Sequence, residues 1–221
     1  TMKIFTIVGA RPQFIKAAMV SRAVAARGRW GGGPPLVEDI IHTGQHYDPC
    51  MERLDLEQGH FYLATVHRAE NTDNPERLEN IIAAFGRIAE KYPLVFPVHP
   101  RTRKQLNVLY GGQGEKHEKP GLRLIEPVSF LDMVRLEQTA KVILTDSGGV
   151  QKEAYFQNVP CVTLREETEW GETVSAGWNQ LAGFETERIL RAVREARRGE
   201  NMDAYGDGRA SERIVKALAL M

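Results

Sequence analysis

The stretch TDSGGVQKE at residues 145–153 marks the point where an apolar strand meets a helix. Such a turn aims unpaired backbone N–H groups and the positive end of the helix dipole at one point. The glycines Gly148 and Gly149 let a ligand approach the backbone, and the Ser147 hydroxyl can donate a further hydrogen bond. The turn therefore predicts a phosphate site. Glu153, one turn into the helix, is then placed to accept hydrogen bonds from sugar hydroxyls.

The same turn has a plainer interpretation. Ser147 or Asp146 can act as an ordinary N-cap, and the glycines can serve only to ease a tight turn. Glycine-rich turns between a strand and a helix are common in α/β folds. The motif alone therefore leaves both interpretations open.

Outward from this turn, short apolar segments alternate with longer amphipathic ones, which is typical of βαβ units on a parallel sheet. The fold class is therefore α/β, with a regular doubly wound domain from residue 61 onward. The first fifty residues supply only a strand, a helix and a strand, too few elements to cover both faces of a sheet. The expected strands are 3–8, 37–43, 61–66, 94–98, 122–125, 141–145 and 161–164, and the expected helices are 13–26, 75–91, 101–109, 130–138, 149–157, 185–198 and 208–220.

Composition restricts the function further. The chain has 221 residues, and 29 Lys and Arg balance 29 Asp and Glu. This balance argues against nucleic acid or an anionic membrane as a main partner. No apolar run approaches the length of a membrane span, and Cys50 and Cys161 cannot form a disulfide framework. We therefore expect a cytoplasmic protein that binds any anionic ligand through local groups.

Other candidate residues follow expected strands. Arg11, in the turn after the first strand, offers a planar fork to a phosphate, and Lys16 adds a second cation one turn later. His46, His67 and His99 each follow a strand, where ligands of open parallel sheets bind. Taken alone, a cation in such a turn is more often solvated, and a histidine at the end of a strand more often makes a local hydrogen bond.

A metal site is the obvious competing interpretation for the histidines. No His-x-x-x-His or Cys-x-x-Cys spacing occurs, and the histidines belong to separate βα units. We therefore expect no metal and no cofactor.

The acidic segment 165–173 is typical of a solvated loop when it is taken alone. It directly follows the strand expected at 161–164. Beside a phosphate site, Arg165 becomes a candidate ligand contact.

Together these segments resemble the non-hydrolysing UDP-N-acetylglucosamine 2-epimerases. The resemblance implies a GT-B-like fold, in which two Rossmann-type domains face each other across a cleft, and it implies a homodimer. Residues 1–51 would be the first piece of an incomplete N-terminal domain, 52–203 the UDP-binding domain, and 204–221 a helix that packs back on the N-terminal domain. The resemblance is carried by residues 9–16, 42–48, 65–71, 98–100, 144–153, 167–170 and 205–208.

The resemblance also implies roles for individual residues. The family reaction eliminates UDP to give a glycal and adds it back with C2 inverted, and His67 takes the catalytic role near the departing phosphate. A cationic pocket at helix N-termini stabilises the charge on leaving UDP. The residues implied to bind the UDP-sugar are Arg11, Lys16, His99, Ser147, Gly148, Gly149, Glu153 and Arg165, with Gln45 and His46 as further cleft contacts.

Elimination also needs a general base and a general acid at C2 and C3. The family supplies carboxylates from His-Gly-Asp-Thr and Glu-Ala-Gly-Leu-Arg segments, and neither segment occurs in this sequence. The sequence passes directly from Met51 to Glu52 where that stretch is expected. We therefore expect a segment to be missing between these residues, and a chain that truly lacks it should bind UDP without epimerisation.

The primary expectation is epimerisation of UDP-N-acetylglucosamine to UDP-N-acetylmannosamine. Gln13, where many relatives have an acidic residue, resembles the branch that acts on UDP-2,3-diacetamido-2,3-dideoxyglucuronate, because an extra substrate carboxylate would be repelled by an acid. A UDP-sugar-binding module or a degenerate glycosyltransferase relative, without epimerase chemistry, is the alternative from a different class.

Overall fold

The computed structural model divides the chain into two compact units, one of Thr1–His46 with Met202–Met221 and one of Tyr47–Asn201. The residues that it describes are 2–8, 36–42, 50–111, 119–200, 205–206 and 209–218. The predicted helix 13–26 and the candidate residues Arg11, Lys16, Gln45 and His46 lie outside the described residues.

In the first unit, β1 (Met2–Val8) and β2 (Leu36–His42) pair in parallel. The two strands confirm the segments predicted at 3–8 and 37–43. The same unit contains α10 (Ala210–Leu218), where Ser211 and Val215 are buried one turn apart.

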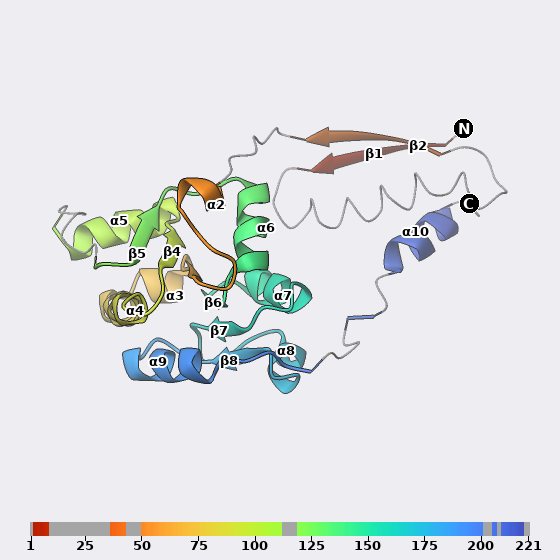
Figure 1. Ribbon diagram of the computed structural model, residues 1–221. Helices are drawn as coiled ribbons and strands as arrows, with labels where there is room; N and C mark the ends of the chain where they lie inside the picture. Colours follow the sequence, from red (N-terminus) through yellow and green to blue (C-terminus); the bar gives the residue numbers. More distant parts are fainter. Residues whose placement is uncertain are drawn as a thin grey trace. The chain divides into compact units, whose positions relative to one another are not determined.

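Within the described residues, the second unit is built on a six-stranded parallel sheet with the order β5-β4-β3-β6-β7-β8 (Figure 1). The order runs outward from β3 in one direction and from β6 in the other. This reversal is the switch point of a doubly wound sheet, and it confirms the predicted α/β class. The strands are β3 (Tyr62–Thr65), β4 (Leu94–Pro97), β5 (Leu122–Ile125), β6 (Val142–Thr145), β7 (Cys161–Thr163) and β8 (Asn179–Leu181).

Helices cover both faces of this sheet, as a parallel sheet requires (Figure 1). None of the helices in the described ranges is long and apolar enough to cross a membrane. The helices of the second unit are α2 (Cys50–Arg53), α3 (Ala69–Thr72), α4 (Pro75–Ile88), α5 (Pro100–Leu109), α6 (Phe130–Thr139), α7 (Gly148–Phe156), α8 (Gly171–Ser175) and α9 (Thr186–Glu195).

Side chains of the strands alternate between two hydrophobic clusters, because successive residues of a strand face opposite sides. Tyr62 and Ala64 pack in the cluster that includes α4, α5 and α9. Phe61 and Leu63 pack in the cluster that includes α2, α6 and α7. Cys161 belongs to the second cluster, and burial raises the pKa of its thiol to about 12.

Four short elements were not predicted: α2, α3, α8 and β8. β8 lacks an apolar run, and Asn179 is buried there because its side chain pairs with a neighbouring strand. The Thr163 hydroxyl donates to the Asn179 Oδ1 at 2.7 Å. The longer elements that fall within the described residues were predicted correctly, although α4 and α9 end earlier than their sequence patterns indicated.

Gly121 supplies a stability test, because it combines a positive φ of +89° with close packing. A Cβ added there would lie 2.3 Å from the backbone oxygen of Ala89. We expect Gly121→Ala to lower the free energy of unfolding by roughly 3 kcal/mol, since about 1–2 kcal/mol of left-handed strain adds to about 1–3 kcal/mol of overpacking. Urea unfolding followed by circular dichroism measures the loss.

Gly59→Ala is the matched control. Gly59 also has a positive φ, +77°, but an added Cβ meets nothing within 4 Å. This variant should lose only the backbone term of about 1–2 kcal/mol. Equal losses in the two variants would show that the contact with Ala89 does not matter.

Candidate functional site

The turn after β6 has the geometry that the sequence predicted. Ser147 is the N-cap of α7, and its Oγ accepts from the Val150 N–H at 3.5 Å. Gly148, the first residue of the helix, is buried, and Gly149 is exposed. The strand-to-helix turn is confirmed, and its binding of phosphate stays a prediction.

A buried carboxylate joins this turn to the turn after β3. Asp146 is 0% exposed, and its oxygens accept from the His67 N–H at 3.1 Å and from the Arg68 N–H at 3.0 Å. The Asn71 amide donates to the same carboxylate at 3.2 Å and to the Leu164 carbonyl at 2.9 Å. The loops that follow β3, β6 and β7 are therefore hydrogen-bonded to one another.

Hydroxyl groups reinforce this edge of the sheet. Thr65 and Thr145 are the last residues of β3 and β6, and their hydroxyl oxygens lie 2.6 Å apart. The Thr145 hydroxyl oxygen also accepts from the Ser147 N–H at 2.9 Å. On the other side of β3, the Thr102 hydroxyl of α5 donates to the Val66 carbonyl at 2.5 Å. The backbone that leaves the sheet is thus held in place before any ligand arrives.

Two of the three candidate histidines lie together. The rings of His67 and His99 have centroids 5.8 Å apart. His99 is the N-cap of α5, and its Nδ1 accepts from the Arg101 N–H at 3.2 Å. The side chain of His67 is 40% exposed and lies 3.7 Å, Nδ1 to Oδ1, from Asp146. His67 is therefore the histidine that combines a buried charged neighbour with access to solvent.

Arg165 follows β7 and is held by carboxylates. It is only 5% exposed, and its guanidinium donates to both oxygens of Glu169 at 3.1 Å. Carboxylate oxygens of Glu70 and Glu167 lie at 3.8 and 3.9 Å from it. These contacts stabilise the loop after β7, and the predicted ligand contact of Arg165 stays a prediction.

The loop after β7 packs against the first turn of α7. The Trp170 indole N–H donates to the Gly148 carbonyl at 2.7 Å, and the Lys152 Nζ lies 4.2 Å from the Trp170 ring. A Cβ on Gly148 would lie 3.3 Å from Glu169 Oε2 and from the indole nitrogen. Glycine is favoured there because the loop approaches so closely. Glu169 also faces Arg68, whose guanidinium lies 3.6 Å away.

Glu153 lies on α7 and is 8% exposed, so its carboxylate is mostly buried. Its contact with ribose stays a prediction. In the described part of the chain, no group of three or more His, Cys, Asp or Glu side chains could hold a metal ion.

Two site residues, Arg68 and Asn71, were not singled out from the sequence, and Asp146 was considered only as an N-cap, a role that Ser147 takes. Arg68 and Asn71 stand within the segment that carries His67, and Asp146 directly precedes the N-cap Ser147. Nothing in the sequence around Asp146 predicts that its carboxylate accepts hydrogen bonds from the backbone of the segment that carries His67.

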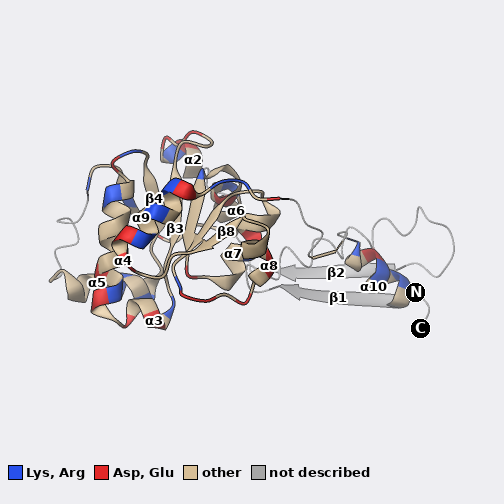
Figure 2. Ribbon diagram, turned by 90° about the horizontal axis from the view of Figure 1, so that it is seen from below, with Lys and Arg blue, Asp and Glu red and all other residues tan. Residues whose placement is uncertain are grey.

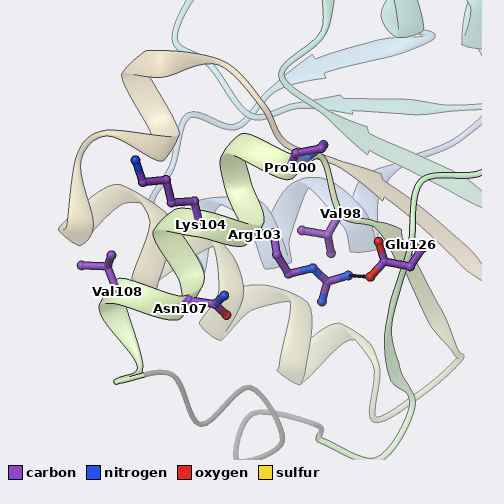
Figure 3. A pocket seen from close by; sticks show the side chains of 7 residues that line it. All are labelled: Val98, Pro100, Arg103, Lys104, Asn107, Val108 and Glu126. Carbon is purple, nitrogen blue, oxygen red and sulfur yellow. Dashed lines mark hydrogen bonds and ion pairs between the residues drawn. The ribbon is translucent and has the colours of Figure 1, made fainter.

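Elsewhere in the described part of this unit, neither the charges nor the hollows indicate a second site. Basic and acidic residues are interspersed along α4 and α9, where Arg87 pairs with Glu187 (Figure 2). An open groove of about 650 Å³ runs beside α5, and Arg103 and Glu126 pair there at 2.9 Å (Figure 3). None of the candidate site residues lines this groove, whose lining is Val98, Pro100, Arg103, Lys104, Asn107, Val108 and Glu126.

Comparisons with known proteins agree with the resemblance. A family model described as UDP-N-acetylglucosamine 2-epimerase matches residues 51–219. A UDP-N-acetylglucosamine 2-epimerase homolog of Methanococcus maripaludis is 51% identical over 170 residues, which cover 76% of this chain and 47% of that protein. The UDP-2,3-diacetamido-2,3-dideoxy-D-glucuronate 2-epimerase of Pseudomonas aeruginosa is 45% identical over 166 residues, which cover 73% and 45%.

A solved structure is similar as well. The UDP-GlcNAc 2-epimerase of Methanocaldococcus jannaschii matches with a TM-score of 0.69 and 38% identity, covering 78% of this chain and 49% of that one. The predicted GT-B-like α/β class is confirmed. The chain spans about half the length of the curated relatives that it matches.

Glu169 provides a test of the charges in the site. A hydrogen bond with its own backbone and the Arg165 guanidinium hold the pKa of this carboxyl below its ordinary value, against burial, which raises it. Since the folded pKa is the lower one, the stability gained is present above the ordinary pKa and is lost as pH falls through the lowered value. We expect Arg165→Met to raise the pKa part of the way back, measured by a carboxyl ¹³C NMR titration.

Arg77→Met is the control, because Arg77 pairs with Glu70 and Glu166. It should leave the titration of Glu169 unchanged. An unchanged pKa in Arg165→Met, or equal rises in both variants, would contradict the assignment of the shift to Arg165.

Proposed function

The chain belongs to the UDP-N-acetylglucosamine 2-epimerase family. We propose that it forms part of an enzyme that converts UDP-N-acetylglucosamine to UDP-N-acetylmannosamine. The observation that carries this proposal is the juxtaposition of the α7 N-terminus with His67 at the switch point between β3 and β6. Ligands of doubly wound sheets bind at this position.

The diphosphate is proposed to bind at the first turn of α7. The turn is closed over Gly148 by Glu169 and Trp170, but a Cβ on Gly149 would meet only the Ser147 Oγ, at 3.7 Å. Backbone N–H groups at this turn and the helix dipole favour an anion. The exposed part of His67 supplies a group that can donate to the same anion.

The nucleoside is proposed to extend along α7 toward Glu153. A carboxylate accepts well from two neighbouring hydroxyls, as the acidic residue of dinucleotide-binding folds does with ribose. Because Glu153 is 8% exposed, ribose would replace little water when it binds there. This contact would distinguish a ribonucleotide from a deoxyribonucleotide.

The chemical step would break the bond between C1 of the sugar and the UDP oxygen. Donors that are already in position at the α7 N-terminus and at His67 would stabilise the negative charge that develops on UDP. Removal and return of the C2 proton need a base and an acid, and the family resemblance implies carboxylates for these roles in segments that this sequence lacks. We therefore propose that the described residues promote departure of UDP and that the N-terminal domain of the protein supplies the acid and the base.

A second candidate is 2-epimerisation of UDP-2,3-diacetamido-2,3-dideoxyglucuronate. It is supported by the relative of that name at 45% identity and by Gln13. The homodimer, the cytoplasmic location and the domain limits 1–51, 52–203 and 204–221 stay predictions from the family resemblance.

The first test of the site is the binding of UDP, measured by calorimetry. We expect Glu153→Gln to weaken UDP binding about tenfold, since a hydrogen bond to a charged group contributes about 1.5–3 kcal/mol. The variant should also lose the preference of the wild type for UDP over 2′-deoxyuridine diphosphate.

Glu137→Gln is the control, because Glu137 is also a buried helical glutamate, on α6, at 0% exposure against 8% for Glu153. It should keep both the affinity and the preference. A Glu153→Gln variant that still prefers UDP would refute the ribose contact.

The second test concerns the substrate. In D₂O, epimerisation through a glycal exchanges the C2 hydrogen for deuterium, which ¹H NMR detects. We expect faster exchange in UDP-N-acetylglucosamine than in UDP-2,3-diacetamido-2,3-dideoxyglucuronate. The opposite preference would favour the second candidate. UDP binding without exchange in either sugar would contradict epimerase activity and indicate a UDP-sugar-binding module.

A further inference from the structure

We propose that Asp146 is a positioning residue, which holds the His67 imidazole with Nδ1 toward its carboxylate and Nε2 toward the ligand. The orientation of the ring follows from contacts within the chain. Only its consequence for UDP rests on the proposed function.

The first argument is the cost of burying Asp146. A carboxylate that is 0% exposed is stable only when hydrogen bonds replace its water. Those bonds come from the His67 and Arg68 N–H groups and from the Asn71 amide, at 3.0 to 3.2 Å. Two of the donors are consecutive backbone groups, so Asp146 fixes the chain at the residue that carries the imidazole.

The second argument is the unequal use of the two oxygens. Oδ2 accepts from Arg68 and Asn71 and shares the His67 N–H. Oδ1 shares that same N–H and lies 3.7 Å from the His67 Nδ1. This separation is an ion-pair distance. Oδ1 therefore accepts fewer hydrogen bonds than Oδ2 and can accept one more, and it faces the imidazole.

The third argument is the consequence for the ring. A carboxylate beside Nδ1 favours the tautomer with the proton on that nitrogen and stabilises the imidazolium. Nε2, on the opposite edge, then faces away from Asp146. The side chain is 40% exposed, so this edge is accessible from solvent, and the His99 ring at 5.8 Å restricts rotation. Asp146 thus acts through His67 and does not need to touch the ligand.

The test reads the tautomer directly. Long-range ¹H–¹⁵N NMR spectra of ¹⁵N-histidine-labelled protein, recorded without ligand where His67 is neutral, should show the proton on Nδ1. Asp146→Asn keeps the shape but replaces one acceptor oxygen with a donor. We expect it to shift His67 toward the Nε2–H tautomer and to weaken UDP binding about tenfold, as loss of one charged hydrogen bond implies.

Asp132→Asn is the matched control. Asp132 is a 2% exposed aspartate at the start of α6, where it accepts from the Ser129 hydroxyl at 2.6 Å and the Cys50 N–H at 3.3 Å. It should lose stability, measured by thermal unfolding, while the His67 tautomer and the UDP affinity stay unchanged.

Two results would overturn the proposal. One is a wild-type protein in which neutral His67 carries its proton on Nε2. This measurement does not depend on whether a variant folds. The other is an Asp146→Asn variant that loses stability but keeps the wild-type tautomer, because Asp146 would then only tie the turns together. A wild-type protein with the Nδ1–H tautomer that does not bind UDP would refute the proposed function and leave the positioning of His67 intact.

Discussion

The candidate site depends on the register in which β3 pairs with β6. Tyr62 lies opposite Val142 and Thr65 opposite Thr145, so the two parallel strands end side by side. The chain leaves the sheet at the same height on both strands, and the two turns diverge from there because the strand order reverses at this pair. Only in this register can the Asp146 carboxylate reach the backbone of His67. A shift by one residue would turn it to the other face of the sheet.

Burial of the sheet on both faces determines how polar this edge must be. All residues of β3 and β6 are buried, so polar groups that follow them have little water to bind. The Thr65 and Thr145 hydroxyls and the Asp146 carboxylate meet that need with hydrogen bonds inside the chain. The requirement that stabilises the fold therefore also makes the site rigid before a ligand binds, which is what stabilisation of a leaving group requires.

Local chemistry explains how much of this could be predicted from the sequence. Asn74 and Pro75 signal the start of α4, and the serine and glycines at 147–149 signal the turn before α7; both signals need only neighbouring residues. β8 and the role of Asp146 depend instead on which strands become neighbours. The buried Asn179 side chain finds its partners on β7, α7 and α8, at Thr163, Gln151 and Thr173. Asp146 accepts from a segment 79 residues away. No period or spacing in the sequence carries that information.

The ion pairs around this site explain how a chain of zero net charge can attract an anion. Arg165 is 5% exposed and surrounded by carboxylates, so its charge is largely balanced within the chain. Arg68 pairs with Glu169 at 3.6 Å with both side chains substantially exposed, and such pairs contribute only about 0–1 kcal/mol. An anion at the α7 N-terminus could draw Arg68 from Glu169 at little cost, whereas Arg165 would stay where it is. Among the residues that the structure describes, attraction of an anion to this turn then rests on oriented N–H groups, His67 and the exchangeable Arg68, without an excess of positive charge.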